Sequence, residues 1–367
     1  MEDIEKKWLS FQLLCAVRDC HARNLYHGDI KTENALVTSW NWLYLSDFSS
    51  SFKPTYLPED NPADFSFYFD TSGRRTCYLA PERFLDPGTQ TETQGRVNWA
   101  MDIFSVGCVI AELFLETPIF SLSQLFKYRK SEYEPEHTYL SRIEDKNIRE
   151  MVTHMIQLDP EARYSAEEYL NFWRHKAFPD YFYGFLHQYM HLITDPTSGR
   201  TPITAGVENL GESDDRIDRV YYDFDKISYF LGHERGAQQA SPQYGSSIFP
   251  LYVDIPNNRH PASATVSRRV DDGTLIFLTL IVSSLRSTAR ATARVHACEL
   301  LLAFAERVTD EAKLDRIVPY VVALLADPSE IVKVSAVRTL TQVVSHPLPL
   351  LCISRLPFTC PSWPLSR

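Results

Sequence analysis

Two short segments of the sequence carry side chains suited to handling the phosphates of Mg-ATP. The segment HGDIKTEN contains Asp29, Lys31 and Asn34, and the segment DFSSS begins at Asp47. A phosphoryl-transfer site needs a carboxylate that orients the attacking hydroxyl, a cation beside the phosphoryl group, and oxygen ligands for Mg²⁺. We predict that Asp29 is the base, that Lys31 offsets the phosphoryl charge, and that Asn34 and Asp47 bind the nucleotide through the metal.

Residues further along the chain indicate the class of phosphotransferase. Small-molecule kinases of the aminoglycoside and choline type also carry His-Gly-Asp followed by Asn, so the first motif leaves them open. The segment APE ending at Glu82 closes a stretch that begins at Asp47, as the activation segment of a protein kinase does. We expect Asp102, at the start of an apolar helix, to accept hydrogen bonds from the catalytic-loop backbone, and Arg163 to pair with Glu82. This set favours the large lobe (C-lobe) of a protein-kinase-like fold.

Four residues of the two motifs need a separate interpretation. Gly28 stands where protein kinases usually carry Arg before the catalytic Asp, so no cation at this position can receive an activation-segment phosphate. Ser49 replaces the Gly of Asp-Phe-Gly and restricts the backbone there. His27 is expected to be a buried, hydrogen-bonding structural residue, and Asp47 could alternatively cap the turn after its strand. We predict a site that is either constitutive or inert.

The small lobe of a protein kinase, with its Gly-rich loop and β3 lysine, is not identifiable in the sequence. The residues before His27 instead predict one helix, because Ile4, Trp8, Phe11 and Leu14 recur at helical spacing. We therefore expect a C-lobe with the small lobe missing, in a fragment of a longer protein. Such a fragment is expected to bind ATP weakly or not at all.

Composition narrows the function classes. The 367 residues suggest two or three domains, and 44% hydrophobic residues can supply their cores. The formal net charge of -10 argues against nucleic-acid binding. The most apolar stretch, residues 275–282, is too short to span a membrane. Seven cysteines form no C-x-x-C pair, so we expect reduced thiols rather than a zinc site.

The pattern along the chain predicts four regions. Residues 1–180 form the kinase-like C-lobe, and residues 181–272, rich in Pro, Gly, Ser and Asp, form a linker. The aromatic segment DDRIDRVYYDFDKISYFLG inside this linker is predicted to be a docking helix or strand. Residues 273–345 are predicted to be HEAT repeats, and residues 346–367 form a Pro-rich tail, which is either aberrant (a frameshift or intron read-through) or genuinely disordered.

The HEAT prediction rests on helical periodicity. The segment RIVPYVVALLADPSEIVKVSAVRTLTQVVS predicts two helices joined by a turn at Asp327-Pro328, and the sequence before it predicts another pair. One buried stripe per helix is predicted from Val318, Val321, Val322 and Leu325, and from Val332, Val334, Val337, Leu340 and Val344. The predicted fold class is mainly α, with a kinase-like C-lobe followed by a linker and a short α-solenoid.

These features together resemble the phosphoinositide 3-kinase regulatory subunit 4 family, also called the vacuolar protein sorting-associated protein 15 family. The most specific segments are HGDIKTENALVTSWNWLYLSDFSS, TCYLAPERF and DDRIDRVYYDFDKISYFLG. The resemblance implies a regulatory, scaffolding subunit of the class III phosphatidylinositol 3-kinase complex that carries a serine/threonine protein kinase domain, with ATP and Mg as cofactors. It also implies two partners, the lipid kinase catalytic subunit and a Beclin-type subunit.

The family acts in autophagy and in endosomal and vacuolar sorting. The resemblance therefore implies a cytoplasmic protein that is peripheral on endosomal and autophagic membranes. Two functions remain open from the residues. In the first, the chain is a scaffold that grips the lipid kinase; in the second, it is an active serine/threonine protein kinase that transfers the γ-phosphate of ATP to a protein hydroxyl.

Overall fold

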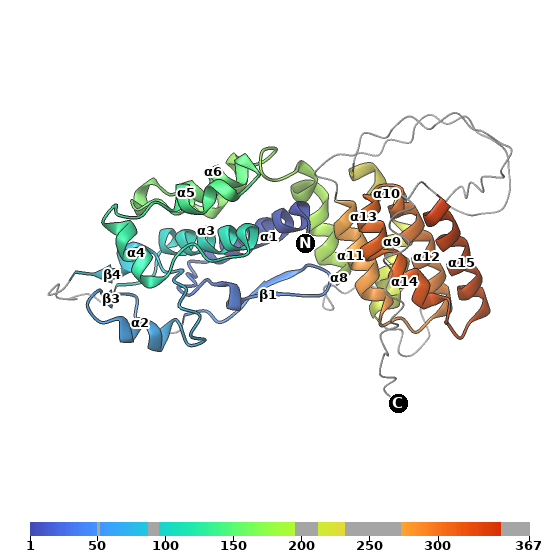
Figure 1. Ribbon diagram of the computed structural model, residues 1–367, viewed down its shortest axis with the longest axis horizontal. Helices are drawn as coiled ribbons and strands as arrows, with labels where there is room; N and C mark the ends of the chain where they lie inside the picture. The colour runs from blue at the N-terminus through green and yellow to red at the C-terminus, as the bar shows by residue number, and fades with distance from the viewer. Residues whose placement is uncertain (50–51, 87–94, 195–211, 232–272, 346–367) are drawn as a thin grey trace. The chain divides into compact units, whose positions relative to one another are not determined.

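The computed structural model describes residues 1–49, 52–86, 95–194, 212–231 and 273–345, and these are mainly helical (Figure 1). The chain divides into two compact units, one of residues 1–198 with 270–276 and one of residues 199–269 with 277–367. Most of the predicted linker, the predicted tail at residues 346–367, Cys352 and Cys360 lie outside the described residues.

The first unit is built around helix α3 (Trp99–Leu115). Its sequence, WAMDIFSVGCVIAELFL, is apolar on every side, which is typical of a helix surrounded by other elements. The Asn98 side chain caps its start by accepting a hydrogen bond from the amide of Met101 at 3.0 Å. Glu116, in the left-handed region at φ 57°, ends it. Both ends of the central helix are thus set by the sequence.

Helix α1 (Asp3–His21) confirms the single helix predicted before His27. It packs against α3, against α7 (Ala166–Phe172) and against strand β2 (Leu43–Leu45). The rings of Trp8 and Phe11 lie 5.1 Å and 5.4 Å from the ring of Phe182. Because α1 runs directly into the segment of His27, this aromatic packing fixes where that segment starts.

Two small sheets shape the rest of the site. Strand β1 (Ala35–Val37) pairs antiparallel with β2, with Leu36 opposite Tyr44, and forms a hairpin between Asn34 and Asp47. Strand β3 (Leu57–Pro58) pairs in parallel with β4 (Phe84–Leu85). The second pair joins the beginning of the predicted activation segment to the residues that follow its end.

Further helices complete the first unit. Helix α6 packs against α3, and Asp145 caps it by accepting hydrogen bonds from the amides of Asn147 and Ile148. The helices are α2 (Pro62–Tyr68), α4 (Leu122–Arg129), α5 (Pro135–Thr138), α6 (Lys146–Met155) and α8 (His187–Thr194), with a π-helical turn at Phe182–Leu186.

The described part of the second unit is entirely helical. Its helices pack against neighbours both near and far in sequence, since α9 contacts α10 and α12, and α15 contacts α12 and α14 (Figure 1). The aromatic segment of the predicted linker is helical and forms α9 and α10. The helices are α9 (Glu212–Tyr222), α10 (Phe224–Phe230), α11 (Thr274–Leu285), α12 (Ala291–Ala305), α13 (Asp310–Arg316), α14 (Val318–Leu324) and α15 (Glu330–Ser345).

The predicted buried stripe of the last two helices is partly wrong. Val321 and Val332 are buried as predicted, but Val334 and Val337 are 63% and 55% exposed. The exposed members also include Val322 and Val344. Residues two apart on a helix point to nearly opposite sides, so Val332 and Val334 cannot face the same neighbour. The buried face of α15 consists of Val332, Ala336, Thr339 and Val343.

The predicted turn between these helices is present. The side chain of Asp327 accepts a hydrogen bond from the amide of Ser329 at 2.9 Å, just before α15 begins. The guanidinium of Arg294, on α12, lies 2.7 Å from the same carboxylate. A single acid therefore orders the turn and ties it to the neighbouring helix.

Two valines on α15 give a matched test of this burial pattern. We expect Val332→Ser to destabilise the helical unit by about 2 to 4 kcal/mol, because it leaves a cavity and a buried hydroxyl. Val334→Ser should change stability by less than about 0.5 kcal/mol, because the side chain is exposed. Urea unfolding of the whole chain, followed by circular dichroism, measures both. Equal losses in the two variants would contradict the assignment of the buried face.

Candidate active site

The catalytic loop, residues 27–34, is hydrogen-bonded to the carboxylate of Asp102 in α3. Its two oxygens accept hydrogen bonds from the backbone amides of His27 and Gly28, each at 2.8 Å. The ring nitrogen Nε2 of His21 lies 3.0 Å from the same carboxylate. Asp102 is 1% exposed, so all three partners lie inside the unit. The structure confirms the hydrogen bonds predicted for Asp102.

Asp29 and Asn34 lie in contact within this loop. The side-chain nitrogen Nδ2 of Asn34 donates to the backbone oxygen of Asp29 at 2.8 Å, and it lies 3.3 Å from the Asp29 carboxylate. A short 3₁₀ turn, Thr32–Asn34, brings the two residues together. Because Nδ2 of Asn34 makes the contacts with Asp29, the side-chain oxygen Oδ1 of Asn34 is not used in them. An amide oxygen of this kind suits Mg²⁺ as a ligand.

Two lysines neutralise the Asp29 carboxylate. Lys31 Nζ lies 3.3 Å from Asp29 Oδ2, and it also donates to the backbone oxygen of Phe69. Lys53 Nζ lies closer, at 2.6 Å from the same oxygen. The sequence motifs did not indicate Lys53, because it belongs to the activation segment and reaches the loop only through the fold.

Asp47 follows β2 in a left-handed backbone conformation, with φ at 57°. This region costs a non-glycine residue about 1 kcal/mol or more and is enriched at functional sites. Its neighbours are tied to the catalytic loop, since the amide of Ser46 donates to Asn34 and the amide of Ser49 donates to His27. The side chain of Asp47 is exposed. The structure thus brings Asp29, Lys31 and Asn34 into direct contact and joins Asp47 to them through the backbone.

His27 is buried and hydrogen-bonded, as predicted. Its Nε2 lies 2.8 Å from the backbone oxygen of Ser46, and its Nδ1 accepts from the amide of Asp29 at 3.2 Å. These partners assign a neutral ring with the proton on Nε2. Burial lowers the pKa of His27, although its hydrogen bond to Ser46 opposes that shift.

Glu82 and Arg163 form the predicted ion pair. Two guanidinium nitrogens of Arg163 lie 2.7 Å and 3.0 Å from the two carboxylate oxygens of Glu82. Arg163 also donates to the backbone oxygens of Gln157 and Ala100, and its guanidinium lies 5.1 Å from the ring of Phe104. The Arg163 side chain is fully buried and that of Glu82 is 21% exposed, and the pair fixes the end of the activation segment to the helical core.

Gly28 is required by its surroundings. Its φ is 74°, and a Cβ placed there would lie 2.9 Å from the Cβ of Ser49 and 2.9 Å from a methyl group of Val97. An arginine at this position, usual in protein kinases, would therefore clash as well as strain the backbone. The sequence departure at Gly28 has a structural reason.

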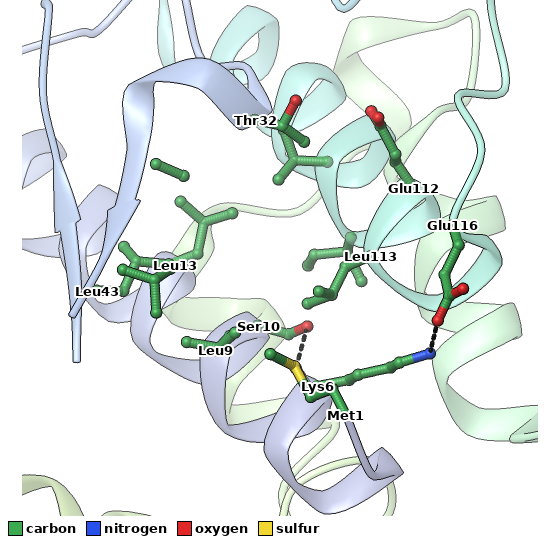
Figure 2. A pocket seen from close by; sticks show the side chains of 14 residues that line it. Met1, Lys6, Leu9, Ser10, Leu13, Thr32, Leu43, Glu112, Leu113 and Glu116 are labelled. Carbon is green, nitrogen blue, oxygen red and sulfur yellow. Dashed lines mark hydrogen bonds and ion pairs between the residues drawn. The ribbon is translucent and has the colours of Figure 1, made fainter. Parts of the chain in front are cut away.

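A separate apolar cavity of about 410 Å³ lies between α1, β1 and α3 (Figure 2). Leu9, Leu13 and Leu113 line it, and an ion pair between Lys6 and Glu116 at 3.4 Å stands at one side. Neither Asp29 nor Asp47 lines it, so this cavity is separate from the predicted phosphate site.

Other site types find little support in the described residues. Within them, no group of three or more His, Cys, Asp or Glu side chains could hold a metal ion. The five cysteines in the described ranges are free thiols, and burial raises the pKa of Cys15 and of Cys77 to about 12. None of the helices in the described part of the chain is long and apolar enough to cross a membrane.

The fold and the site define a protein-kinase-like domain, and comparison with known families supports this class. The protein kinase domain family matches residues 1–173, and the family described as PIK3R4-like, middle domain, matches residues 277–348. The first match contains all eight of the predicted site residues. The second match falls almost entirely within the described part of the second unit, which is helical.

Individual relatives narrow the class to a family. Serine/threonine-protein kinase VPS15 of Saccharomyces cerevisiae is 41% identical over 94% of this chain and 26% of its own length. The protein of the same name from Arabidopsis thaliana is 38% identical over 93% of this chain and 26% of its own length. The chain belongs to the phosphoinositide 3-kinase regulatory subunit 4 (VPS15) family, as its motifs predicted, and it spans about a quarter of the length of these relatives.

The buried neutral His27 makes a prediction for pH. Its folded-state pKa lies below the unfolded value of about 6.5, so the unfolded chain binds more protons and stability falls as the pH drops below about 6.5. We expect His27→Gln to weaken this pH dependence between about pH 7 and pH 5, while lowering stability at neutral pH. Urea midpoints followed by tryptophan fluorescence measure it. His187, whose pKa burial lowers to about 4, contributes to the same slope and stays in the variant.

The matched control is His137→Gln. The side chain of His137 is 82% exposed, so its removal should leave the pH dependence unchanged. An unaltered slope in a folded His27→Gln protein would show that His27 is not held neutral by the fold.

Proposed function

We propose that this chain is part of a regulatory, scaffolding subunit of a class III phosphatidylinositol 3-kinase complex that carries a serine/threonine protein kinase domain. The family assignment supports the subunit, and the kinase-like site supports the domain. The proposed process is autophagy and endosomal or vacuolar sorting, at cytoplasmic positions on the surface of those membranes. The proposed partners are the lipid kinase catalytic subunit and a Beclin-type subunit.

One observation carries the scaffold role: the interactions that shape the catalytic loop are internal to the first unit. Asp102 holds the loop from α3, and the Glu82–Arg163 pair holds the end of the activation segment. Neither interaction uses a nucleotide. The unit can therefore present a fixed surface to a partner whether or not ATP is bound.

The charge around Asp29 also favours a scaffold over an enzyme. A general base must offer its carboxylate to the attacking hydroxyl. Here Oδ2 of Asp29 already has Lys53 at 2.6 Å and Lys31 at 3.3 Å. With two cations on one buried oxygen, the carboxylate stabilises the activation segment, and Lys53 stands beside the oxygen that a substrate would need.

The second candidate function is an active serine/threonine protein kinase. It is favoured by the complete set of groups, including the strained backbone of Asp47. In this function Asp29 orients a protein hydroxyl and Lys31 offsets the phosphoryl charge. Asn34 and Asp47 have the oxygen donors that Mg²⁺ prefers and would hold it. The bound Mg-ATP would supply the transferable γ-phosphoryl group and neutralise its charge.

The finer organisation of the chain is also part of the proposal. We assign residues 1–180 to a kinase C-lobe, residues 181–272 to a linker and residues 273–345 to HEAT repeats of an α-solenoid, with a Pro-rich tail after them. The paired packing of α12 with α15 and of α14 with α15 supports the solenoid. Within the described residues no small-lobe sheet with a Gly-rich loop accompanies the C-lobe.

Nucleotide affinity separates the two functions. Because the described residues supply metal ligands but no Gly-rich loop, we expect calorimetry of this chain to show no saturable Mg-ATP binding up to about millimolar concentration. Asp47→Ala should behave like the parent. Micromolar affinity for Mg-ATP that disappears in Asp47→Ala would instead support the active protein kinase.

Partner binding tests the scaffold directly. We expect Arg163→Ala to abolish binding to the lipid kinase catalytic subunit, because leaving Glu82 unpaired costs about 3 to 5 kcal/mol and unfolds the first unit. Asp29→Asn keeps the shape of the side chain and should bind within about threefold of the parent. Pull-down with purified partner, with circular dichroism on each variant, measures both.

The two variants control one another, since Arg163→Ala removes a fully buried guanidinium, whereas Asp29→Asn removes a charge whose lysine partners are partly exposed and can be hydrated. Loss of binding in a well-folded Asp29→Asn protein would show that the chemistry of the catalytic loop is required, and the scaffold role would be wrong.

A further inference from the structure

Arg83, the residue after the APE segment, is a buried cation whose contacts no motif predicted. It is 1% exposed, although arginine is rarely buried without a carboxylate partner. Burial lowers the pKa of Arg83 to about 10, with Asp102 and Asp29 opposing the shift. The guanidinium therefore stays charged at neutral pH inside the unit.

Its hydrogen bonds join two segments that are far apart in the sequence. One guanidinium nitrogen donates to the backbone oxygen of Gly28 in the catalytic loop at 2.5 Å. The other two nitrogens donate to the backbone oxygens of Thr55 and Pro54, at 2.8 Å and 3.1 Å. All three nitrogens of the planar fork are thus used on main-chain acceptors, two of them in the activation segment.

The ring of Phe69 lies against this bridge. The guanidinium of Arg83 is 4.9 Å and the ammonium of Lys53 is 5.4 Å from the centre of that ring. The backbone oxygen of the same residue accepts from Lys31. Phe69 is buried and so gathers three cations around the point where the activation segment meets the catalytic loop.

Gly28 and Arg83 are matched to each other. A side chain at position 28 has no room beside Ser49 and Val97, so the cation that protein kinases usually carry there cannot be present. Arg83 brings a cation to the backbone of the same residue from a different element. In kinases that are switched by phosphorylation, a new arginine–phosphate pair orders the activation segment. Here the arginine is already engaged with main-chain oxygens.

We propose that Arg83 is a positioning residue, which fastens the activation segment to the catalytic loop and keeps the segment ordered without phosphorylation. The inference deepens the proposed function, on which it rests for treating residues 27–34 as a catalytic loop. Arg83 acts through Gly28, Pro54 and Thr55, and it touches none of the groups assigned to the chemistry.

The test is amide hydrogen exchange of the full chain carrying Arg83→Lys. Lysine keeps the charge but cannot donate to three acceptors in the planar geometry of arginine. We expect the amides of Leu57 and Glu59 to exchange at least about tenfold faster, while amides of α3 are unchanged. Arg142→Lys, at an exposed arginine of the same unit, is the matched control and should leave both regions unchanged.

Two results would overturn the proposal. In the first, residues 53–59 of a folded Arg83→Lys protein exchange as in the parent. In the second, α3 exchanges faster to the same degree, so that Arg83 is a general core residue and has no specific effect on the segment.

A second measurement needs no variant. The parent chain, shown by mass spectrometry to carry no phosphate, should already protect Glu59, whose amide donates to Leu85. Free exchange of Glu59 that slows only after phosphorylation of the segment would also overturn the proposal. Neither measurement uses a partner or a nucleotide, so loss of lipid kinase binding would count against the proposed function and leave this inference standing.

Discussion

The carboxylate of Asp102 is the constraint on which the site depends. A buried carboxylate is costly unless each oxygen is hydrogen-bonded, and this one satisfies the amides of His27 and Gly28, which would otherwise be orphaned inside the unit. The two loop amides replace water around the Asp102 carboxylate, and the carboxylate in turn fixes the position of the loop. Because Asp102 lies in the first turn of the buried helix α3, the position of that helix fixes the position of the catalytic loop.

Other buried charges follow the same rule. Arg163 is held by Glu82 and by backbone oxygens, Arg83 by three backbone oxygens, and Asp29 by two lysines. Each joins a loop of the site to another segment of the unit. Removing one partner leaves the other charge uncompensated, which costs far more than the net stability of the intact interaction. The site is therefore held by charge networks whose first effect is on folding, which is what a scaffold requires.

The sequence predicted the contacts that belong to the protein-kinase pattern. The burial of His27, the hydrogen bonds of Asp102 and the pair of Glu82 with Arg163 are present as predicted. The last two join residues 74 to 81 positions apart, so the pattern of motifs and not local spacing predicted them. Lys53 and Arg83 were missed. Both reach the catalytic loop through tertiary contacts of the activation segment, and no local spacing encodes which carbonyl or carboxylate they meet.

The second unit shows a different limit of prediction from sequence. Periodicity found α12, α14 and α15 with the turn at Asp327, but it assigned Val334 and Val337 to the buried side. Valine on both faces of α15 makes the pattern ambiguous, and only the neighbouring helix decides that Val332 and Val343 are the buried members. The domain boundaries and the chemical roles of the site residues remain predictions.

Asp102→Asn tests whether the framework of the first unit, rather than the nucleotide, shapes the catalytic loop. The amide keeps the shape of the side chain but can no longer accept at both ends. Urea unfolding followed by tryptophan fluorescence reports on the first unit, which contains Trp8, Trp42 and Trp99. We predict that the variant loses about 2 to 4 kcal/mol of unfolding free energy, equally with and without Mg-ATP. Parent-like stability, or full recovery on adding Mg-ATP, would contradict it.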